Sequence, residues 1–391
     1  MNQAANLVVS RRRALGLGSA ILATATITGC SSDGGSGAQS SGTPQTVNAT
    51  SENVRLIGRT YEEDGATWLP QSGSALEFEA TATSIKIQMV GDENVDNEAD
   101  LRPRFAVLVD GEVVLDDTLS ESPHTVEVPL DEPLDGGIVE VIHLSEANRG
   151  IVGVRSVTVE SNVPSPIAPT VQKDLSIGFI GDSITCAYGV EATSNDDPYT
   201  TTTQNFMKSY AYLTAQELDA DYETVCYSGY GIVSGWSGDG ERNEDMLMPP
   251  IYDLVANGHK QTWDFAAHPH HVIVMNVGTN DFTYTGTDEA RIQEFAQGYT
   301  EFLARVRELN PESFIICTLG TMWGCEVLYP SLEQAIGDFR ENTGDTRVVC
   351  YLSEPLDKEV DGWVANGHPN EKGQREIAQL LVSVIREVLK A

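Results

Sequence analysis

Basic side chains are scarce in this chain of 391 residues. It has 24 Lys and Arg against 58 Asp and Glu, which gives a formal net charge of −34 at pH 7. Proteins that bind DNA or RNA neutralise phosphates with cationic side chains, and this chain would repel them instead. The composition therefore argues against a nucleic-acid partner, and it favours solubility without indicating a particular chemistry.

Long hydrophobic runs are also missing. No interior segment reaches the roughly 18 apolar residues of a membrane span. The one marginal run, residues 15–27, lies near the N-terminus and is short and rich in Gly, Ala and Thr. The chain can still form hydrophobic cores, because 40% of its residues are hydrophobic. Its length of 391 residues predicts two domains plus a leader.

Cysteine is rare, which argues against a fold held together by disulfides. After the leader, five cysteines remain, so they cannot all pair within the chain. Most are expected to be reduced and buried as small hydrophobic side chains, although one or two disulfides are compatible with an exported protein. The five are Cys186, Cys226, Cys317, Cys325 and Cys350.

The first 30 residues are interpreted as an export signal. Three arginines at 11–13 match a twin-arginine signal, and the apolar run ends at Cys30 in a sequence that resembles the lipobox of bacterial lipoproteins. We therefore expect Cys30 to be lipidated and the protein to be anchored to the outer face of the cytoplasmic membrane by lipid alone. An ordinary signal peptide with a chance cysteine is the alternative. Residues 31–51, rich in Ser and Gly, are predicted to be a flexible linker.

Residues 52–162 have hydrophobic side chains at every second position. Ile85, Ile87 and Met89 alternate with Lys86 and Gln88, for example. Short alternating runs between Gly, Asp and Pro turns predict an all-β domain, a sandwich or jelly roll. The proline-containing segment 163–173 is the predicted linker to the next domain.

Residues 174–391 have a different pattern. Continuous apolar runs predict strands that are buried on both faces, and amphipathic stretches between them predict helices. This alternation predicts a three-layer α/β domain with a parallel sheet, in which a site lies beyond the carboxyl ends of the strands. The predicted strands are 176–180, 224–227, 271–277, 313–319 and 347–352, and the predicted helices are 209–218, 288–309, 332–340 and 371–389.

Four blocks follow predicted strands or precede the last helix, and they point to acyl transfer. Ser183 follows the first strand in Gly-Asp-Ser, which alone is weak because these residues also form turns. Gly229 follows the second strand and Asn280 the third, where each could donate to an oxyanion. Either one alone could serve only to turn the chain, but two such residues in this order favour the oxyanion interpretation. His368 precedes the last helix and could take the proton of a serine hydroxyl.

In this order, Ser183, Gly229, Asn280 and His368 resemble the four blocks of the SGNH (GDSL) hydrolase superfamily over residues 174–391. The resemblance implies a flavodoxin-like SGNH hydrolase domain with Ser183 as nucleophile and His368 as general base. It also implies an oxyanion hole made by the Ser183 N–H, Gly229 and Asn280. Gly231 is the alternative to Gly229. The resemblance implies no cofactor and no metal.

One position departs from this superfamily. An aspartate usually lies three residues before the histidine and orients its ring, whereas this chain has Ala365 there. Two groups could replace it: Asp361, although its spacing is wrong for the same geometry, or a backbone carbonyl, which we favour. A catalytically dead protein is a third interpretation.

A β-sandwich before an SGNH domain resembles carbohydrate esterase family 2, as do the segments 209–215, 228–232 and 321–324. This resemblance implies an acetyl xylan esterase-like enzyme that removes acetyl groups, often from 6-O positions, with acetylated polysaccharide or oligosaccharide as partner. Two alternatives are a general short-chain esterase or lipase and a dead cell-surface glycan-binding protein. In a third, the N-terminal sandwich alone binds the polysaccharide.

Two further groups of side chains are candidate sites. Trp236, Trp323 and Trp363 lie in predicted loops where one of them could stack on a sugar, with Trp323 favoured, although packing is the ordinary role of a tryptophan. The cluster His268, His270 and His271 precedes a strand at its amino end, opposite the predicted site, and lacks partners at metal-ligand spacing.

Overall fold

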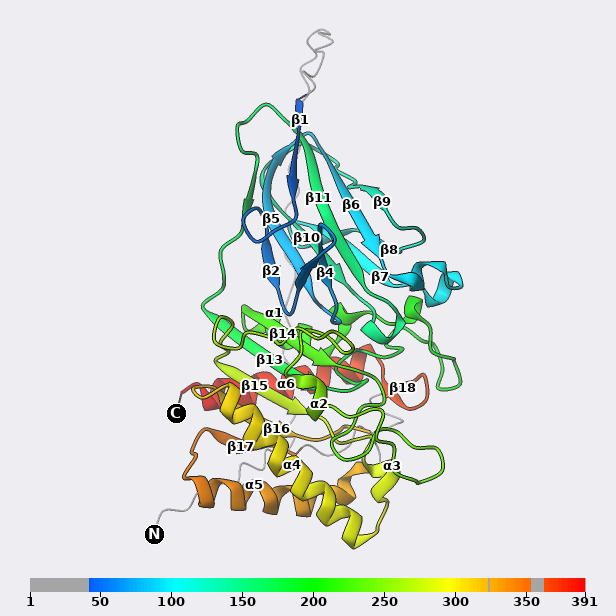
Figure 1. The fold of residues 1–391 in the computed structure, drawn as a ribbon, viewed down its shortest axis with the longest axis vertical. Coiled ribbons are helices and arrows are strands. Elements are labelled where there is room, and N and C mark those ends of the chain that lie inside the picture. The colour runs from blue at the N-terminus through cyan, green and yellow to red at the C-terminus, as the bar shows by residue number, and fades with distance from the viewer. Residues whose placement is uncertain (1–41, 323, 353–361, 391) are drawn as a thin grey trace, which may run out of the picture. The chain divides into compact units, whose positions relative to one another are not determined.

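The computed structural model describes residues 42–322, 324–352 and 362–390 (Figure 1). The predicted signal, the lipidation site Cys30, Trp323 and Asp361 lie outside these residues. Within the described part of the chain, no helix is both long enough and apolar enough to cross a membrane.

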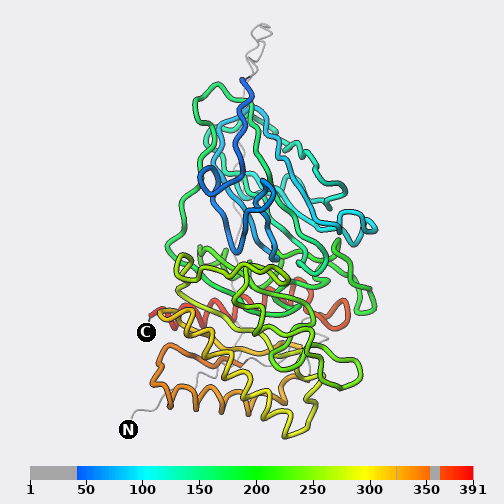
Figure 2. Tube along the Cα trace, viewed as in Figure 1, coloured from blue at the N-terminus to red at the C-terminus, as the bar shows by residue number. Residues whose placement is uncertain are grey.

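The N-terminal half consists of two antiparallel sheets, coloured blue to green in Figure 2. One has the order β3-β4-β11-β6-β9, with β1 paired to β11; the other has the order β12-β5-β10-β7-β8, with β2 paired to β5. Their bounds are β1 Thr43–Asn48, β2 Arg55–Ile57, β3 Tyr61–Glu63, β4 Ala66–Leu69, β5 Ala75–Ala82, β6 Ser84–Gly91, β7 Arg104–Val109, β8 Glu112–Thr118, β9 His124–Glu127, β10 Leu134–His143, β11 Val152–Ser161 and β12 Ile167–Pro169.

The alternation seen in the sequence sets which side chains form the core of these sheets. In β6, Ile85, Ile87 and Met89 are buried while Lys86 is exposed. Side chains of successive strand residues point to opposite faces, so the apolar ones collect between the sheets. Phe78 and Val139, from strands of the other sheet, belong to the same core cluster.

Two segments that we predicted to be linkers contain strands. The predicted flexible stretch 31–51 includes β1, which pairs residue by residue with β11, and the predicted linker 163–173 includes β12, which pairs with β5. Both strands have mostly exposed or half-buried side chains. They are held by backbone pairing rather than by an apolar face, and hydrophobic patterning therefore could not reveal them.

The C-terminal half contains a five-stranded sheet of order β14-β13-β15-β16-β17, in which every adjacent pair is parallel. Its central strands are buried on both faces; all five residues of β15 are buried. This explains their continuous apolar sequence. The bounds are β13 Leu175–Gly181, β14 Ala220–Cys226, β15 Val272–Asn276, β16 Phe314–Thr318 and β17 Val348–Cys350.

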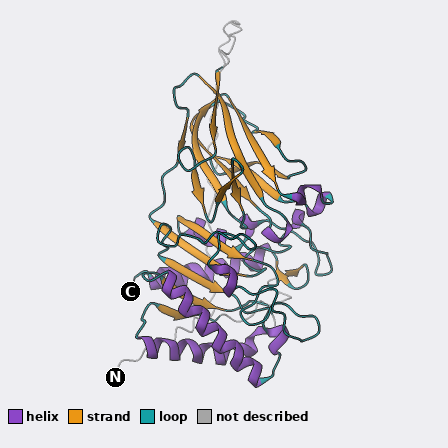
Figure 3. Ribbon diagram, viewed as in Figure 1, coloured by secondary structure: helices purple, strands orange, loops and turns teal. Residues whose placement is uncertain are grey.

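Helices cover both faces of this sheet (Figure 3). Phe295 of α4 and Ile336 of α5 belong to one core cluster, whereas Tyr210 of α1 and Leu381 of α6 belong to another. The long helices begin at side-chain caps where the sequence offers them, as at Asp288 before α4. The helices are α1 Tyr210–Glu217, α2 Pro249–Tyr252, α3 Phe282–Thr285, α4 Glu289–Leu309, α5 Tyr329–Thr343 and α6 Glu371–Val388.

Candidate active site

The carboxyl ends of three parallel strands bring the predicted blocks to one edge of the sheet. Gly181 at the end of β13 pairs with Cys226 at the end of β14 and with Asn276 at the end of β15. The residues that directly follow these ends, 182–185, 227–231 and 277–281, therefore lie beyond the same edge. This is where an open α/β sheet places its ligand site.

Ser183 and His368 contact each other at this edge. The His368 Nε2 atom lies 2.8 Å from the Ser183 Oγ atom, although the two residues are 185 positions apart. His368 opens the short strand β19 (His368–Pro369), which pairs with β18 (Trp363–Val364). Asn370 directly after it caps α6, because its side chain accepts the backbone N–H groups of two residues in the first turn. The backbone of His368 is thus held by the β18–β19 hairpin on one side and by the capped start of α6 on the other.

The other ring nitrogen of His368 contacts the backbone at the position where the superfamily has its aspartate. His368 Nδ1 lies 2.8 Å from the Ala365 carbonyl oxygen. Ala365, Asn366 and Gly367 have φ angles of 37°, 60° and 84°, a left-handed turn that directs this carbonyl back to the ring. A backbone carbonyl was one of the two groups predicted to orient the histidine, and the Ala365 carbonyl lies at hydrogen-bond distance. The other group, Asp361, lies outside the described residues.

This arrangement determines the protonation of the ring. Burial lowers the pKa of His368 to about 4, and the hydrogen bond to the Ala365 carbonyl acts in the opposite direction. At neutral pH the imidazole is therefore neutral. With Nδ1–H donating to the carbonyl, Nε2 is the unprotonated nitrogen and faces the Ser183 hydroxyl, as a general base requires.

The backbone N–H of Gly229 is open to a ligand, whereas that of Gly231 is not. Gly231 N–H donates to the Met246 carbonyl at 3.0 Å. For the N–H groups of Gly229 and Ser183, no acceptor is found in the described part of the chain. Gly229 has a φ of 85°, a conformation that glycine adopts without strain. Gly229 is thus preferred over its alternative as an oxyanion donor.

Asn280 has one amide N–H committed and one nearly free. Its Nδ2 donates to the Tyr230 carbonyl at 2.9 Å, and its second contact, with Asp182 Oδ2, is only 3.5 Å. Neighbouring Asp281 is fully buried and accepts the backbone N–H groups of residues 232, 233 and 234. Residues 280 and 281 together fix the loop that carries Gly229, and the second contact of the Asn280 amide is the long one to Asp182.

Asp182, directly before Ser183, has a structural role. Its Oδ1 accepts the Ile184 N–H at 3.0 Å, which closes the turn after β13. Burial raises its pKa to about 7, and this hydrogen bond works against that rise.

The two predicted tryptophans that the structure describes lie near Gly229 and near Gly367. Trp236 is 57% exposed, and its Cβ lies 3.9 Å from where a Cβ on Gly229 would be. Trp363 is half-buried, and its ring lies 3.5 Å from the equivalent point on Gly367, next to His368. The position of Trp323, our preferred residue, lies outside the described residues.

Sequence reasoning missed Tyr188. Its ring stacks on the His368 imidazole, with centroids 4.3 Å apart and planes at 28°. A tyrosine five residues after the serine is the only sequence signal, and nothing distinguishes it from a packing residue.

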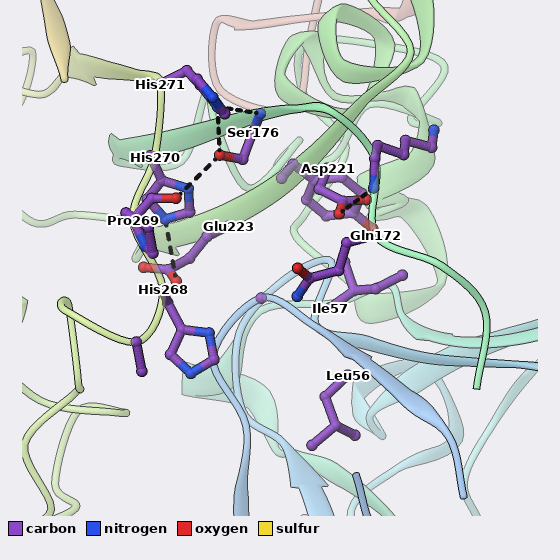
Figure 4. A pocket seen from close by; sticks show the side chains of 14 residues that line it. Leu56, Ile57, Gln172, Ser176, Asp221, Glu223, His268, Pro269, His270 and His271 are labelled. Atoms are coloured by element: carbon purple, nitrogen blue, oxygen red, sulfur yellow. Dashed lines mark hydrogen bonds and ion pairs between the residues drawn. The ribbon is translucent and has the colours of Figure 1, made fainter. Parts of the chain in front are cut away.

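The histidine cluster lies at the opposite end of the sheet, as predicted. His268, His270 and His271 line a cavity of about 240 Å³ near the amino ends of β13 and β15 (Figure 4). His271 Nδ1 accepts the Ser176 N–H at 3.1 Å, and His270 Nε2 lies 3.4 Å from the buried Glu223. In the described part of the chain, no three His, Cys, Asp or Glu side chains are grouped so as to hold a metal ion.

Residues 179–376 match the GDSL-like Lipase/Acylhydrolase family. The acetylxylan esterase / glucomannan deacetylase of Cellvibrio japonicus (strain Ueda107) is 25% identical over 353 residues, which are 88% of this chain and 91% of the relative. The cellulase/esterase CelE of Acetivibrio thermocellus is 29% identical over 334 residues, 81% of this chain but 37% of that protein.

Solved structures have the same fold. A family two carbohydrate esterase from Clostridium thermocellum in complex with cellohexaose has a TM-score of 0.76 at 24% identity and covers 86% of this chain and 99% of its own. A family two carbohydrate esterase from Cellvibrio japonicus has a TM-score of 0.76 at 23% identity, covering 89% and 98%. The predicted resemblance to the SGNH superfamily and to carbohydrate esterase family 2 is confirmed.

Proposed function

The chain belongs to the GDSL-like lipase/acylhydrolase family, and from this membership and the Ser183–His368 contact we propose that it is a serine esterase that removes O-acetyl groups from polysaccharides or oligosaccharides. The single observation that carries the proposal is the 2.8 Å contact between His368 Nε2 and Ser183 Oγ. The acetyl group and the carbohydrate come from the relatives, which are named acetylxylan esterase and glucomannan deacetylase.

In the proposed reaction, Ser183 Oγ attacks the acetyl carbonyl and passes its proton to His368 Nε2. The negative charge on the carbonyl oxygen is stabilised by the N–H groups of Gly229 and Ser183 and by the amide of Asn280. Each such donor is worth about 3–4 kcal/mol of transition-state stabilisation. The ester bond then breaks, and the sugar oxygen leaves with the proton from Nε2.

Water completes the cycle. It attacks the acetyl-Ser183 ester, gives its proton to His368 Nε2 and releases acetate as Ser183 recovers its hydroxyl proton. During both steps the Ala365 carbonyl holds Nδ1–H, so the pair acts as a dyad with a backbone acceptor in the place of a carboxylate. The reaction uses only these protein groups and needs no cofactor.

We also propose a fold type for each half of the chain. We assign the C-terminal half to the three-layer flavodoxin-like type, since its strand order β14-β13-β15-β16-β17 corresponds to 2-1-3-4-5. We assign the two N-terminal sheets to the jelly-roll type. Trp236, near Gly229, and Trp363, near Gly367, are the proposed contacts for the sugar ring.

The test is acetate release from acetylated xylan, acetylated glucomannan and O-acetylated peptidoglycan, assayed side by side. We expect release from at least one polysaccharide and its loss in Ser183→Ala, whereas Ser383→Ala, an exposed serine on α6, leaves it unchanged. Aryl esters of different chain length distinguish a deacetylase from a general esterase or lipase. Hydrolysis of the aryl acetate far faster than that of the aryl butyrate supports deacetylation. Carbohydrate binding without acetate release at high enzyme concentration would support a dead glycan-binding protein.

We also propose that the protein is exported and anchored by lipid at Cys30, which rests on the arginines at 11–13 and on the lipobox-like sequence 27–30. Expression of Cys30→Ser in a bacterial host tests this. The unaltered protein is expected in the membrane fraction and the variant in the soluble exported fraction; equal distribution of the two would refute lipidation.

A further inference from the structure

A loop from the N-terminal sheets reaches the edge of the parallel sheet where Ser183 lies. It joins β10 to β11, and its residues Leu144, Ser145 and Glu146 are almost completely buried, at 0%, 0% and 1% exposure. Glu146 Oε2 accepts the backbone N–H of Ser228 at 2.8 Å. Ser228 directly precedes Gly229, the proposed oxyanion donor.

Glu146 is itself held in place. Its backbone N–H donates to Gln204 Oε1 at 3.2 Å, and Gln204 Nε2 donates to the Cys186 carbonyl at 2.9 Å. Cys186 lies three residues after Ser183, so one buried glutamine joins the loop to the segment of the nucleophile. Tyr199 also donates its hydroxyl to Gln204.

The same loop is also connected to His368, the proposed base, through aromatic side chains. The Arg149 guanidinium lies 4.9 Å from the centroid of the Tyr199 ring. Tyr199 contacts Tyr188 with ring centroids 4.6 Å apart, and Tyr188 stacks on His368. A continuous row of side chains therefore leads from the N-terminal sheets to the imidazole.

Buried ion pairs hold the two halves together. Arg59 is fully buried and binds Glu223 at 2.9 Å and the Tyr252 carbonyl at 2.6 Å, while Arg104 binds Glu191 at 2.7 Å. Separating the halves would break these ion pairs and would also expose apolar side chains of both halves that share one core cluster, which is unfavourable. The N-terminal sheets are thus a fixed part of the enzyme.

We propose that the N-terminal sheets belong to the catalytic unit and that Glu146 is a positioning residue, which sets the Ser228–Gly229 turn so that the Gly229 N–H points at the oxyanion. This inference rests on the proposed function and deepens it. Without an acceptor at residue 146, the partly buried Ser228 N–H would turn toward another partner or water and carry Gly229 with it, because a backbone donor shielded from solvent is rarely left unsatisfied.

The role requires an acceptor oxygen, and a negative charge is not needed. Burial raises the pKa of Glu146, while the Ser228 N–H lowers it. A carboxylate so close to a developing oxyanion would also repel it. Glutamine, which has the same length and keeps an oxygen acceptor, should therefore replace Glu146 without loss.

The experiment measures kcat and KM on an aryl acetate for full-length Glu146→Ala and Glu146→Gln. The matched control is Glu132→Ala, an exposed glutamate in the bend before β10. We expect Glu146→Ala to lower kcat by about 10- to 100-fold, below the 10²- to 10³-fold loss for deleting an oxyanion donor, and to change KM by less than about threefold. Glu146→Gln and Glu132→Ala should keep kcat within about threefold of the unaltered chain.

Folding is checked by near-UV circular dichroism and urea unfolding. If Glu146→Ala does not fold, Glu146→Asp replaces it, because its shorter side chain keeps the charge but cannot reach Ser228; its kcat should fall while that of Glu146→Gln does not. Full kcat in the alanine or aspartate variant, or a glutamine variant as impaired as alanine, would refute the role of Glu146 while the proposed function stands. Inactivity of the unaltered chain would instead refute the proposed function and this inference with it.

Discussion

Replacing Ala365 with aspartate restores the residue type that the superfamily usually has before its histidine, and we predict that it impairs this enzyme. Ala365 is fully buried, and its Cβ lies only 2.3 Å from where a Cβ on Gly189 would be. A side chain at 365 is therefore directed at the Gly189 backbone rather than toward Nδ1, which already contacts the Ala365 carbonyl.

The size of the effect follows from these contacts. Overpacking at a tight contact costs roughly 1–3 kcal/mol, and a buried polar group without a partner costs roughly 1–3 kcal/mol more. Ala365→Asp should thus reduce the free energy of unfolding by at least about 2 kcal/mol. If the displaced turn breaks the hydrogen bond to the imidazolium, which is worth roughly 1.5–3 kcal/mol, kcat/KM falls by about 10- to 150-fold.

Urea unfolding and aryl-acetate kinetics measure both quantities. Asn366→Asp is the control, because it places the same charge on the adjacent residue, whose side chain is exposed. We expect its unfolding free energy to change by less than about 0.5 kcal/mol. An Ala365→Asp variant with unchanged stability and a higher kcat/KM would refute the reasoning, since its carboxylate would then have reached the imidazole.

Three further predictions follow from the site. Burial lowers the pKa of His368 to about 4, and the base must be neutral to act. The value of kcat/KM should therefore stay level from about pH 8 to pH 5 and fall roughly tenfold per pH unit below about pH 4. A fall in kcat/KM that begins near the ordinary histidine pKa would show that burial does not lower the pKa of His368. Gly189→Ala should lower kcat/KM and reduce stability by roughly 1–3 kcal/mol because of its contact with Ala365, whereas Gly111→Ala, with a similar positive φ but open space around it, should leave kcat/KM unchanged. Trp236→Ala should raise KM for acetylated polysaccharide by about 3- to 10-fold while KM for an aryl acetate does not change, and Trp68→Ala on β4 is its control; equal effects on both substrates would exclude sugar stacking by Trp236.

The placing of Gly229 and Asn280 at the same edge as Ser183 could be predicted from sequence for a physical reason, whereas the pairing of His368 with Ser183 was implied by the resemblance to the SGNH superfamily. Ser183, Gly229 and Asn280 each follow a buried strand, and parallel strands in register bring such positions together. The pattern of residue types and the order of strands were therefore sufficient to bring these three residues together, and the resemblance supplied their roles.

Other features depend on packing that no local pattern encodes. Whether a carbonyl or Asp361 faces Nδ1 depends on three successive left-handed residues, of which Asn366 and Gly367 favour that conformation and Ala365 does not. Glu146 lies 82 residues from Ser228 in the other half of the chain, and only the packing of the halves brings them together. The strand β1 was missed because backbone pairing rather than an apolar face holds it.

The most direct test of the account is whether Ser183 becomes acetylated during turnover. The enzyme is mixed with an aryl acetate, quenched in acid within the first turnovers and digested for peptide mass spectrometry. We predict an acetyl group on Ser183 in the unaltered chain and none at this position in Ser183→Ala, together with loss of acetate release. Undiminished acetate release by Ser183→Ala, or acetylation of a different residue on the path to acetate, would contradict it.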